Sequence, residues 1–396
     1  MKLTPERELV LSVARQVALG FKENFTGITK KNNINWQDFK LQLDEHCLAP
    51  FAYRNLKVHL DLLPDNLVET LKGNYYYSLN QVTAFESKFM ELHDIFKEKG
   101  IDLIPIKGMA LSQDLYVDCP GRSCADIDVL VKDEDIESAV KILEDLGYSK
   151  NLGDFTKEYW RRNRYHYIFT KIDEPAVELH WALDYPRKKQ LLSKKFKRIR
   201  ETVILKDKNI KMLSPEDTFF SLILHKRRLN LPVSLRDTCD LARLLKKYEG
   251  SFDWDYVLSE AKNAGLCSTV FFALYQVKFF YGIKAPEYAY KSLGLPFWKK
   301  ALIMRFIEKN TFFSEKGINK NYLYLKAYFL LFDNLWEPVE YILNIPKDQF
   351  MQFYGIASKG RKTDFLYHAR IVYMPFRGIY DFLKKDKSIN ERCSIF

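Results

Sequence analysis

One segment, residues 104–131, constrains the fold more than any other part of this sequence. It starts in an apolar run and continues with the pair Lys107-Gly108 and a short stretch whose apolar residues are spaced as in a helix. After a Pro-Gly turn it closes with two aspartates, Asp126 and Asp128, that lead into another apolar run. This order predicts a strand, a glycine turn, a helix, a loop and a second strand that carries two carboxylates.

The two aspartates are spaced to lie on one face of their strand. Successive strand side chains alternate between faces, so Asp126 and Asp128 point the same way, about 7 Å apart along the strand, while Ile127 and Val129 face the core. Carboxylates held at this spacing can bind one or two Mg²⁺ ions. Two such acids are also common as solvated residues ahead of a buried strand. The glycine turn favours a metal site, because a triphosphate needs backbone N–H groups and a helix N-terminus beside the metal-binding acids.

Residues 176–183, with the sequence AVELHWAL, offer a third carboxylate. Alternation along a strand puts Glu178 and His180 on one face. If this strand lies beside the strand of the aspartates, Glu178 can accept a proton from an acceptor hydroxyl or hold the metal that activates it. His180 then orients Glu178, contacts substrate or is a structural histidine. The strand order, which the sequence does not specify, decides between these interpretations.

These motifs together resemble a known family. The sequences KGMALSQDLY, GR, ADIDVLV and VELHW follow one another as in the uncharacterised nucleotidyltransferase family (nucleotidyltransferase family 5) of the DNA polymerase β-like superfamily. The segments CLAPFAYRNL before them, and FFSLILHKRR and LRDTCDLARLL after them, are similar to helices that flank the motifs in that family. The resemblance covers roughly residues 40–250 and implies a nucleotidyltransferase core.

The resemblance implies a role for each motif. Asp126 and Asp128 would be Mg²⁺ ligands and Glu178 the third acid, in a reaction that transfers NMP from an NTP (ATP among the candidates) to an acceptor hydroxyl. Lys107 and Gly108 would form the turn on the phosphate side. Two Mg²⁺ ions are expected, with Mn²⁺ as the alternative metal.

The nucleotide-binding part departs from the wider superfamily, which has Gly-Ser at this turn. Here Met109 follows Gly108, so no hydroxyl follows the glycine. Backbone amides are then expected to bind phosphate, with Lys107 or Arg122 supplying positive charge. Arg122 has a second interpretation, an ion pair with one of the two aspartates. His180 is expected to lie at the nucleotide as well.

Hydrophobic periodicity divides the chain into three parts. Residues 1–98 and 213–396 show the apolar spacing of helices, whereas residues 99–212 alternate strands and helices. In the middle part the pattern predicts the following elements: a helix at 133–146 with Asp133 as its N-cap, strands at 165–170 and 176–183, and a hairpin at 203–212 that turns near Lys208-Asn209. The prediction is an α+β fold: a polymerase-β-like core, made of a small mixed sheet with helices, flanked by N- and C-terminal helical regions.

The formal net charge of +11 favours anionic partners. The run 187–200 has eight Lys or Arg residues and no acid. It is either a solvated face or a surface that binds RNA or another acceptor. The cations Lys226, Arg227 and Arg228 either cap the C-terminus of a helix or form a basic wall over the phosphates. Asp237 and Asp240 are the expected anchors of these cations.

Three functions remain open for such a chain: an enzyme acting on a small molecule such as a sugar or an antibiotic-like acceptor, an enzyme modifying RNA or protein, including a toxin-like role, and a non-catalytic nucleotide-binding scaffold. The presence of all three acids argues against the scaffold. The six cysteines show no metal-binding spacing. No signal peptide and no membrane-spanning apolar run is evident, so a cytoplasmic protein is expected.

Overall fold

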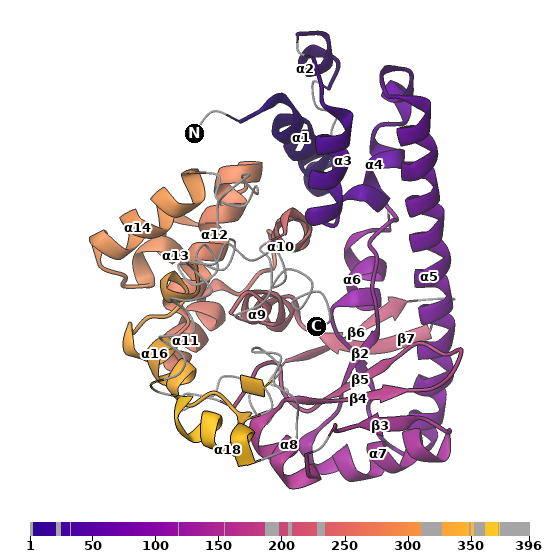
Figure 1. Cartoon of the computed structure of the whole chain (residues 1–396), viewed down its shortest axis with the longest axis vertical. Helices are drawn as coiled ribbons and strands as arrows, with labels where there is room; N and C mark the ends of the chain where they lie inside the picture. Colours follow the sequence, from indigo (N-terminus) through magenta and orange to yellow (C-terminus); the bar gives the residue numbers. More distant parts are fainter. Residues whose placement is uncertain are drawn as a thin grey trace.

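The computed structural model describes residues 3–20, 25–31, 33–117, 119–153, 155–186, 198–204, 208–227, 234–309, 327–347, 350–351, 361–370 and 372. Within these ranges the chain forms a small mixed sheet with helices before and after it (Figure 1). The predicted α+β fold with a helical region on either side is therefore confirmed. Most of the basic run 187–200, and Arg228, fall outside the described residues.

Helices make up the described part of the chain ahead of the sheet: α1 (Pro5–Leu19), α2 (Phe25–Lys31), α3 (Trp36–Glu45), α4 (Ala49–Asn55), the 3₁₀ helix η1 (Lys57–Leu62) and α5 (Asp65–Glu98). Local signals explain where α1 starts and stops. The Thr4 side chain accepts a hydrogen bond from the Arg7 N–H, and Pro5 is the first helical residue. Gly20, with a φ of 77°, ends the helix in the left-handed conformation.

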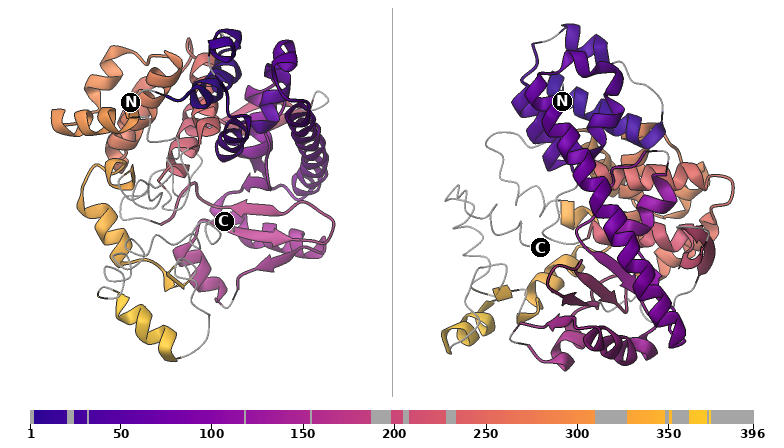
Figure 2. Two further views of the ribbon diagram at one scale, coloured as in Figure 1. Left: turned by 45° about the horizontal axis from the view of Figure 1, so that its top comes forward. Right: turned by 90° about the vertical axis from the view of Figure 1, so that its right-hand side faces the viewer.

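The 34-residue helix α5 connects the N-terminal helices to the sheet. Leu67 and Leu71 pack in one hydrophobic core with the other N-terminal helices, whereas Phe89 and Phe96 pack in a second core under the sheet. Figure 2 shows α5 running from the N-terminal helices to the sheet. Because one helix contributes to both cores, the two parts depend on each other for burial. The domain boundaries after residues 98 and 212 stay predictions.

The main sheet has five strands in the order β1-β2-β5-β4-β3: β1 (Ile104–Pro105), β2 (Ile127–Leu130), β3 (Ser149–Asn151), β4 (His166–Thr170) and β5 (Val177–His180). β2 and β5 are parallel, and the other neighbouring strands are antiparallel. Ile127 and Val129 face the second core, as predicted, together with apolar residues of α7 (Ile136–Asp145). Because successive side chains of a strand alternate between faces, Asp128 points to the opposite face of the sheet.

Several local predictions for this middle part were wrong. Asp133 lies in a 3₁₀ turn, η2 (Asp133–Asp135), and does not cap the following helix, which starts at Ile136. A 3₁₀ turn is a common way for an α-helix to begin. The hairpin consists of β6 (Ile199–Ile204) and β7 (Lys208–Leu213), so it starts earlier than predicted, whereas Lys208, which pairs with Ile204, lies next to its turn as predicted. β3 and the helix α8 (Lys157–Asn163) were not predicted.

Helices resume after β7: α9 (Pro215–His225), α10 (Leu235–Lys247), α11 (Trp254–Ala264), α12 (Cys267–Tyr281), α13 (Glu287–Ser292), α14 (Phe297–Glu308), α16 (Trp336–Leu343) and α18 (Arg361–His368). At the start of α9 the Ser214 side chain accepts a hydrogen bond from the Asp217 N–H, and Pro215 is the first helical residue. α10 contacts α1 and α12, so the N- and C-terminal helices share one core. Among the helices of the described ranges, none is long and apolar enough to cross a membrane.

Candidate functional site

The three predicted acids gather where β2 and β5 run side by side. Asp128 on β2 is the register partner of Glu178 on β5, and Asp126 directly precedes β2. Asp128 is buried, whereas Asp126 and Glu178 are partly exposed. Neighbouring strands lie about 4.8 Å apart. The strand order, which the sequence left open, therefore puts the third acid beside the other two.

Cationic and imidazole groups surround these acids. Lys107 Nζ and His180 Nε2 each lie 3.1 Å from Asp128 Oδ1. His180 Nε2 also lies 3.2 Å from Glu178 Oε2, so this ring bridges two of the acids. His166 on β4 is the register partner of His180 and places its Nε2 3.7 Å from Glu178 Oε1. Sequence reasoning missed His166, although it lies in the strand predicted at 165–170.

The electrostatics of the three acids differ sharply. Burial raises the pKa of Asp126 to about 8, together with the negative charges of Asp128 and Glu178. Burial also works to raise the pKa of Asp128, but Lys107 and His180 outweigh it and hold that pKa well below its usual value. Burial works to raise the pKa of Glu178 too, but the neighbouring His166 and His180 outweigh it and lower that pKa to about 2. Three carboxylates thus share this site, and carboxylates are the ligands that a divalent cation such as Mg²⁺ prefers.

The glycine turn brings the start of α6 (Gly108–Leu115) directly against this site. A Cβ at Gly108 would lie 3.2 Å from Cys124 Cβ and 3.8 Å from Asp128 Oδ2. Lys107 precedes the helix with φ of 51° and ψ of −137°, a backbone conformation that residues other than glycine rarely adopt. The first N–H groups of a helix have no partner within it. Here the helix begins at Gly108, beside the candidate metal ligand Asp128, as a phosphate-binding turn requires.

Gly108→Ala is expected to lower both stability and nucleotide affinity. The new Cβ would lie 3.2 Å from Cys124 Cβ, so Cys124 or the turn must shift by a few tenths of an ångström, and overpacking of this kind costs about 1–3 kcal/mol. Thermal unfolding and nucleotide titration measure the two effects. Gly73→Ala in α5 is the matched control, because an added Cβ there meets nothing within 4 Å. Wild-type affinity in the Gly108 variant would contradict a role for this turn.

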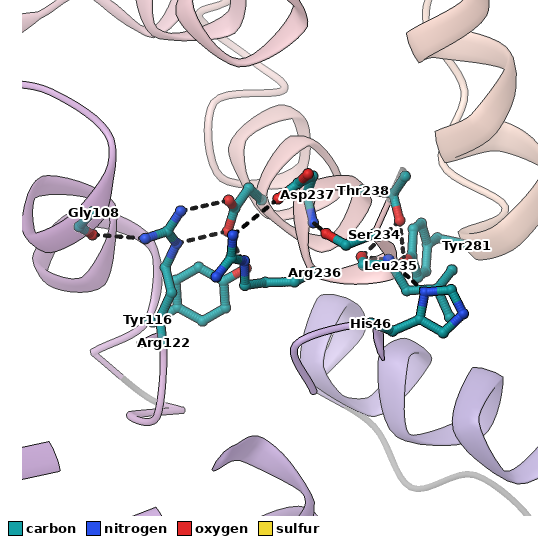
Figure 3. Close-up of polar contacts among 11 residues, drawn as sticks. His46, Gly108, Tyr116, Arg122, Ser234, Leu235, Arg236, Asp237, Thr238 and Tyr281 are labelled. Atoms are coloured by element: carbon teal, nitrogen blue, oxygen red, sulfur yellow. Dashed lines mark hydrogen bonds and ion pairs between the residues drawn. The ribbon is translucent and has the colours of Figure 1, made fainter. Parts of the chain in front are cut away.

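Arg122 is buried and joins the glycine turn to helix α10 (Figure 3). Its Nε and Nη2 donate to Asp240 Oδ1 and Oδ2 at 3.0 and 2.8 Å, and its Nη1 donates to the Gly108 carbonyl at 2.9 Å. Tyr116 Oη donates to Asp240 Oδ1 at 2.6 Å. Burial works against both charges, but the partners outweigh it: the pKa of Asp240 is lowered and that of Arg122 is raised.

The alternative that Arg122 forms an ion pair with Asp126 or Asp128 is wrong, because Asp240 takes that place. Its contact with Gly108 makes Arg122 a support for the turn, and a direct contact with phosphate stays a prediction. Sequence reasoning missed the role of Tyr116 and assigned Asp240 to other cations. No local pattern signals this pairing, since Arg122 and Asp240 are 118 positions apart.

The remaining cations are only partly accounted for. Three of them pair with carboxylates elsewhere: Arg227 with Glu337, Arg198 with Asp253, and Arg200 with Asp114. Asp237, the other expected anchor, lies 3.4 Å from Arg236 Nη2. Lys226 is buried, its pKa is lowered by that burial, and its Nζ has no hydrogen-bond partner among the described residues. A basic wall over the phosphates therefore stays a prediction.

Comparisons with known proteins place these features in context. A family model described as uncharacterised nucleotidyltransferase matches residues 32–282. Among solved structures, the solution structure of the antibiotic-resistance factor ANT(2'')-Ia is similar to 43% of this chain and 85% of that chain, with 14% sequence identity and a TM-score of 0.30. No curated protein matches the sequence.

Proposed function

The chain belongs to the uncharacterised nucleotidyltransferase family, and we propose that it transfers NMP from an NTP to an acceptor hydroxyl in a Mg²⁺-dependent reaction. One observation carries the proposal. Asp128 and Glu178 are partners on parallel strands, with Asp126 next to them and the Gly108 turn against Asp128. Nucleotidyl transfer needs carboxylates that bind the metal close to a turn that binds the phosphates.

The donor set fits a divalent cation with a preference for oxygen. Asp126, Asp128 and Glu178 supply carboxylates, the ligands that Mg²⁺ prefers. Burial is the main cause of the raised pKa of Asp126, and the negative charges of Asp128 and Glu178 add to it, so the three carboxylates lie close enough to act on one another. Bound there, Mg²⁺ supplies charge neutralisation at the phosphates and activation of the acceptor hydroxyl.

The chain's own residues orient the reactants. The backbone N–H groups at Gly108 face the phosphate oxygens, and Lys107 adds a positive charge beside them. Of the two roles expected for Glu178, holding the metal is favoured over accepting the hydroxyl proton. A carboxylate whose pKa is about 2 is a weak base at neutral pH. Arg122 supports the turn through the Gly108 carbonyl.

The direct test is nucleotide transfer by the purified full chain. With Mg²⁺ and radiolabelled NTPs, label is expected to pass to a component of a mixture of cellular metabolites, RNA and protein, and EDTA is expected to abolish the transfer. The Asp126→Ala/Asp128→Ala variant is expected to bind and transfer nucleotide far less than wild type. Asp133→Ala/Glu134→Ala, which removes two exposed acids after the same strand, is the matched control. Equal nucleotide binding by the first variant and wild type would overturn the proposal.

The same experiment separates the acceptor classes. Label on RNA, with binding that weakens steeply as salt rises, would identify a nucleic-acid acceptor. Label on a small molecule, with little salt dependence, would identify a small hydroxyl compound.

A further inference from the structure

Two histidines face Glu178 from neighbouring strands. His166 on β4 and His180 on β5 are register partners, and their rings stack with centroids 4.9 Å apart. Each imidazole turns its Nε2 toward Glu178: His180 lies 3.2 Å from Oε2, and His166 lies 3.7 Å from Oε1. One donor atom of each of the three residues lies within 4.8 Å of the others. Three potential ligands thus lie close enough together to hold one ion.

We propose that His166, Glu178 and His180 form a second cation site, which takes an imidazole-preferring divalent metal of the transition series such as Co²⁺ or Zn²⁺. Two neutral imidazoles with one carboxylate are a common donor set for such ions, whereas Mg²⁺ selects oxygen ligands. The site therefore differs in metal class from the cluster of carboxylates proposed to bind Mg²⁺, although the two share Glu178.

Burial and spacing suit such an ion. Zn–N and Zn–O bonds of about 2.0–2.2 Å place adjacent ligand atoms of a tetrahedral site roughly 3.3–3.5 Å apart. The distances of 3.2 and 3.7 Å from Glu178 to the two imidazoles are close to this spacing. The side chains of His166 and His180 are 8% and 0% exposed and that of Glu178 is 19% exposed, so the carboxylate provides the approach from solvent.

Asp128 is the nearest candidate for a fourth ligand. Its Oδ1 lies 3.1 Å from His180 Nε2, on the side where β2 borders β5. A metal held by the histidines would thus contact both Glu178 and a ligand of the proposed Mg²⁺ site. Occupation of the histidine site then acts on nucleotide transfer through these shared carboxylates.

The test is Co²⁺ binding to the metal-free full chain without nucleotide. Wild type is expected to bind one equivalent of Co²⁺ with a visible spectrum of nitrogen ligation. His166→Ala and His180→Ala are each expected to weaken binding by more than about tenfold, the loss that even an outer-shell partner causes. His93→Ala, a histidine on α5 that contacts Asp94, is the control. Wild-type Co²⁺ affinity and spectrum in both variants would overturn the proposal.

Two further measurements keep the result clear. Co²⁺ is expected to raise the midpoint of thermal unfolding of wild type and of His93→Ala, but not of His166→Ala or His180→Ala. A Co²⁺ spectrum of wild type that shows no nitrogen ligands would overturn the proposal, whatever the variants do. Asp126→Asn is expected to lose nucleotide transfer yet keep the Co²⁺ site. Because His166 and His180 are not ligands of the proposed Mg²⁺ site, Co²⁺ binding without transfer would refute the proposed function alone, and transfer without Co²⁺ binding would refute this site alone.

Discussion

Glu178→Gln is expected to lower the rate constant of nucleotide transfer by about 10²–10⁴-fold. A metal ion contributes several kcal/mol of charge stabilisation to a reaction of this type, and each 1.36 kcal/mol is a factor of ten in rate. The amide keeps the shape of the side chain but removes the charge that holds the ion. Asp126 and Asp128 remain, so the affinity for the metal-bound nucleotide is expected to change much less than the rate. Steady-state transfer assays that separate kcat from KM measure this difference.

Two comparisons make the result specific. Asp128→Asn is expected to lower nucleotide affinity as well as rate, because Asp128 also contacts Lys107 at the glycine turn. Glu174→Gln, in the turn before the same strand, removes a charge that pairs with Lys88 and is expected to leave transfer unchanged. A Glu178 variant with the wild-type rate constant would show that the third acid has no part in catalysis.

The elements that carry this site could be predicted because their signals are local. Alternation places Asp126 and Asp128 on one face and Ile127 and Val129 on the other, and the structure has both aliphatic residues in the core. The glycine turn was evident because few residues other than glycine suit such a close approach. The structure shows this requirement at Gly108, where an added Cβ would lie 3.2 Å from Cys124 Cβ.

The contacts between elements could not be predicted in the same way. That β5 pairs in parallel with β2 depends on the path of the chain through β3, α8 and β4, two of which left no clear pattern. His166 reaches Glu178 only because β4 pairs with β5 on its other side. The partner of Arg122 was assigned to the nearest acids in sequence, whereas burial selects Asp240, on a helix of the C-terminal region. Interactions of this kind follow from tertiary packing rather than local pattern.

Asp240→Asn is expected to destabilise the protein by about 3–5 kcal/mol, the usual result of removing one partner of a buried ion pair. Asp240 and Arg122 are both almost fully buried, and two donors of the guanidinium point at the two carboxylate oxygens. In this variant the Arg122 charge stays in the protein interior without its ion-pair partner, and neutral acceptors, the amide oxygen of the new side chain and the Gly108 carbonyl, are what it keeps. Urea unfolding followed by fluorescence and circular dichroism measures the loss. Asp237→Asn on the same helix is the matched control, with an expected loss below about 1 kcal/mol, because Asp237 and its partner Arg236 are partly exposed.

The double variant Arg122→Met/Asp240→Leu distinguishes stability from positioning. Replacing a buried ion pair with apolar residues of similar size is often neutral or stabilising, so this variant is expected to regain part of the stability that Asp240→Asn loses, less the cost of leaving the Tyr116 hydroxyl without its acceptor. It still lacks the hydrogen bond from Arg122 to the Gly108 carbonyl. If Arg122 positions the glycine turn, nucleotide affinity stays low in this stable variant. Restored stability with wild-type nucleotide affinity in the double variant would show that the ion pair serves only the fold. Equal stability of Asp240→Asn and wild type would refute the stabilising role of the buried ion pair.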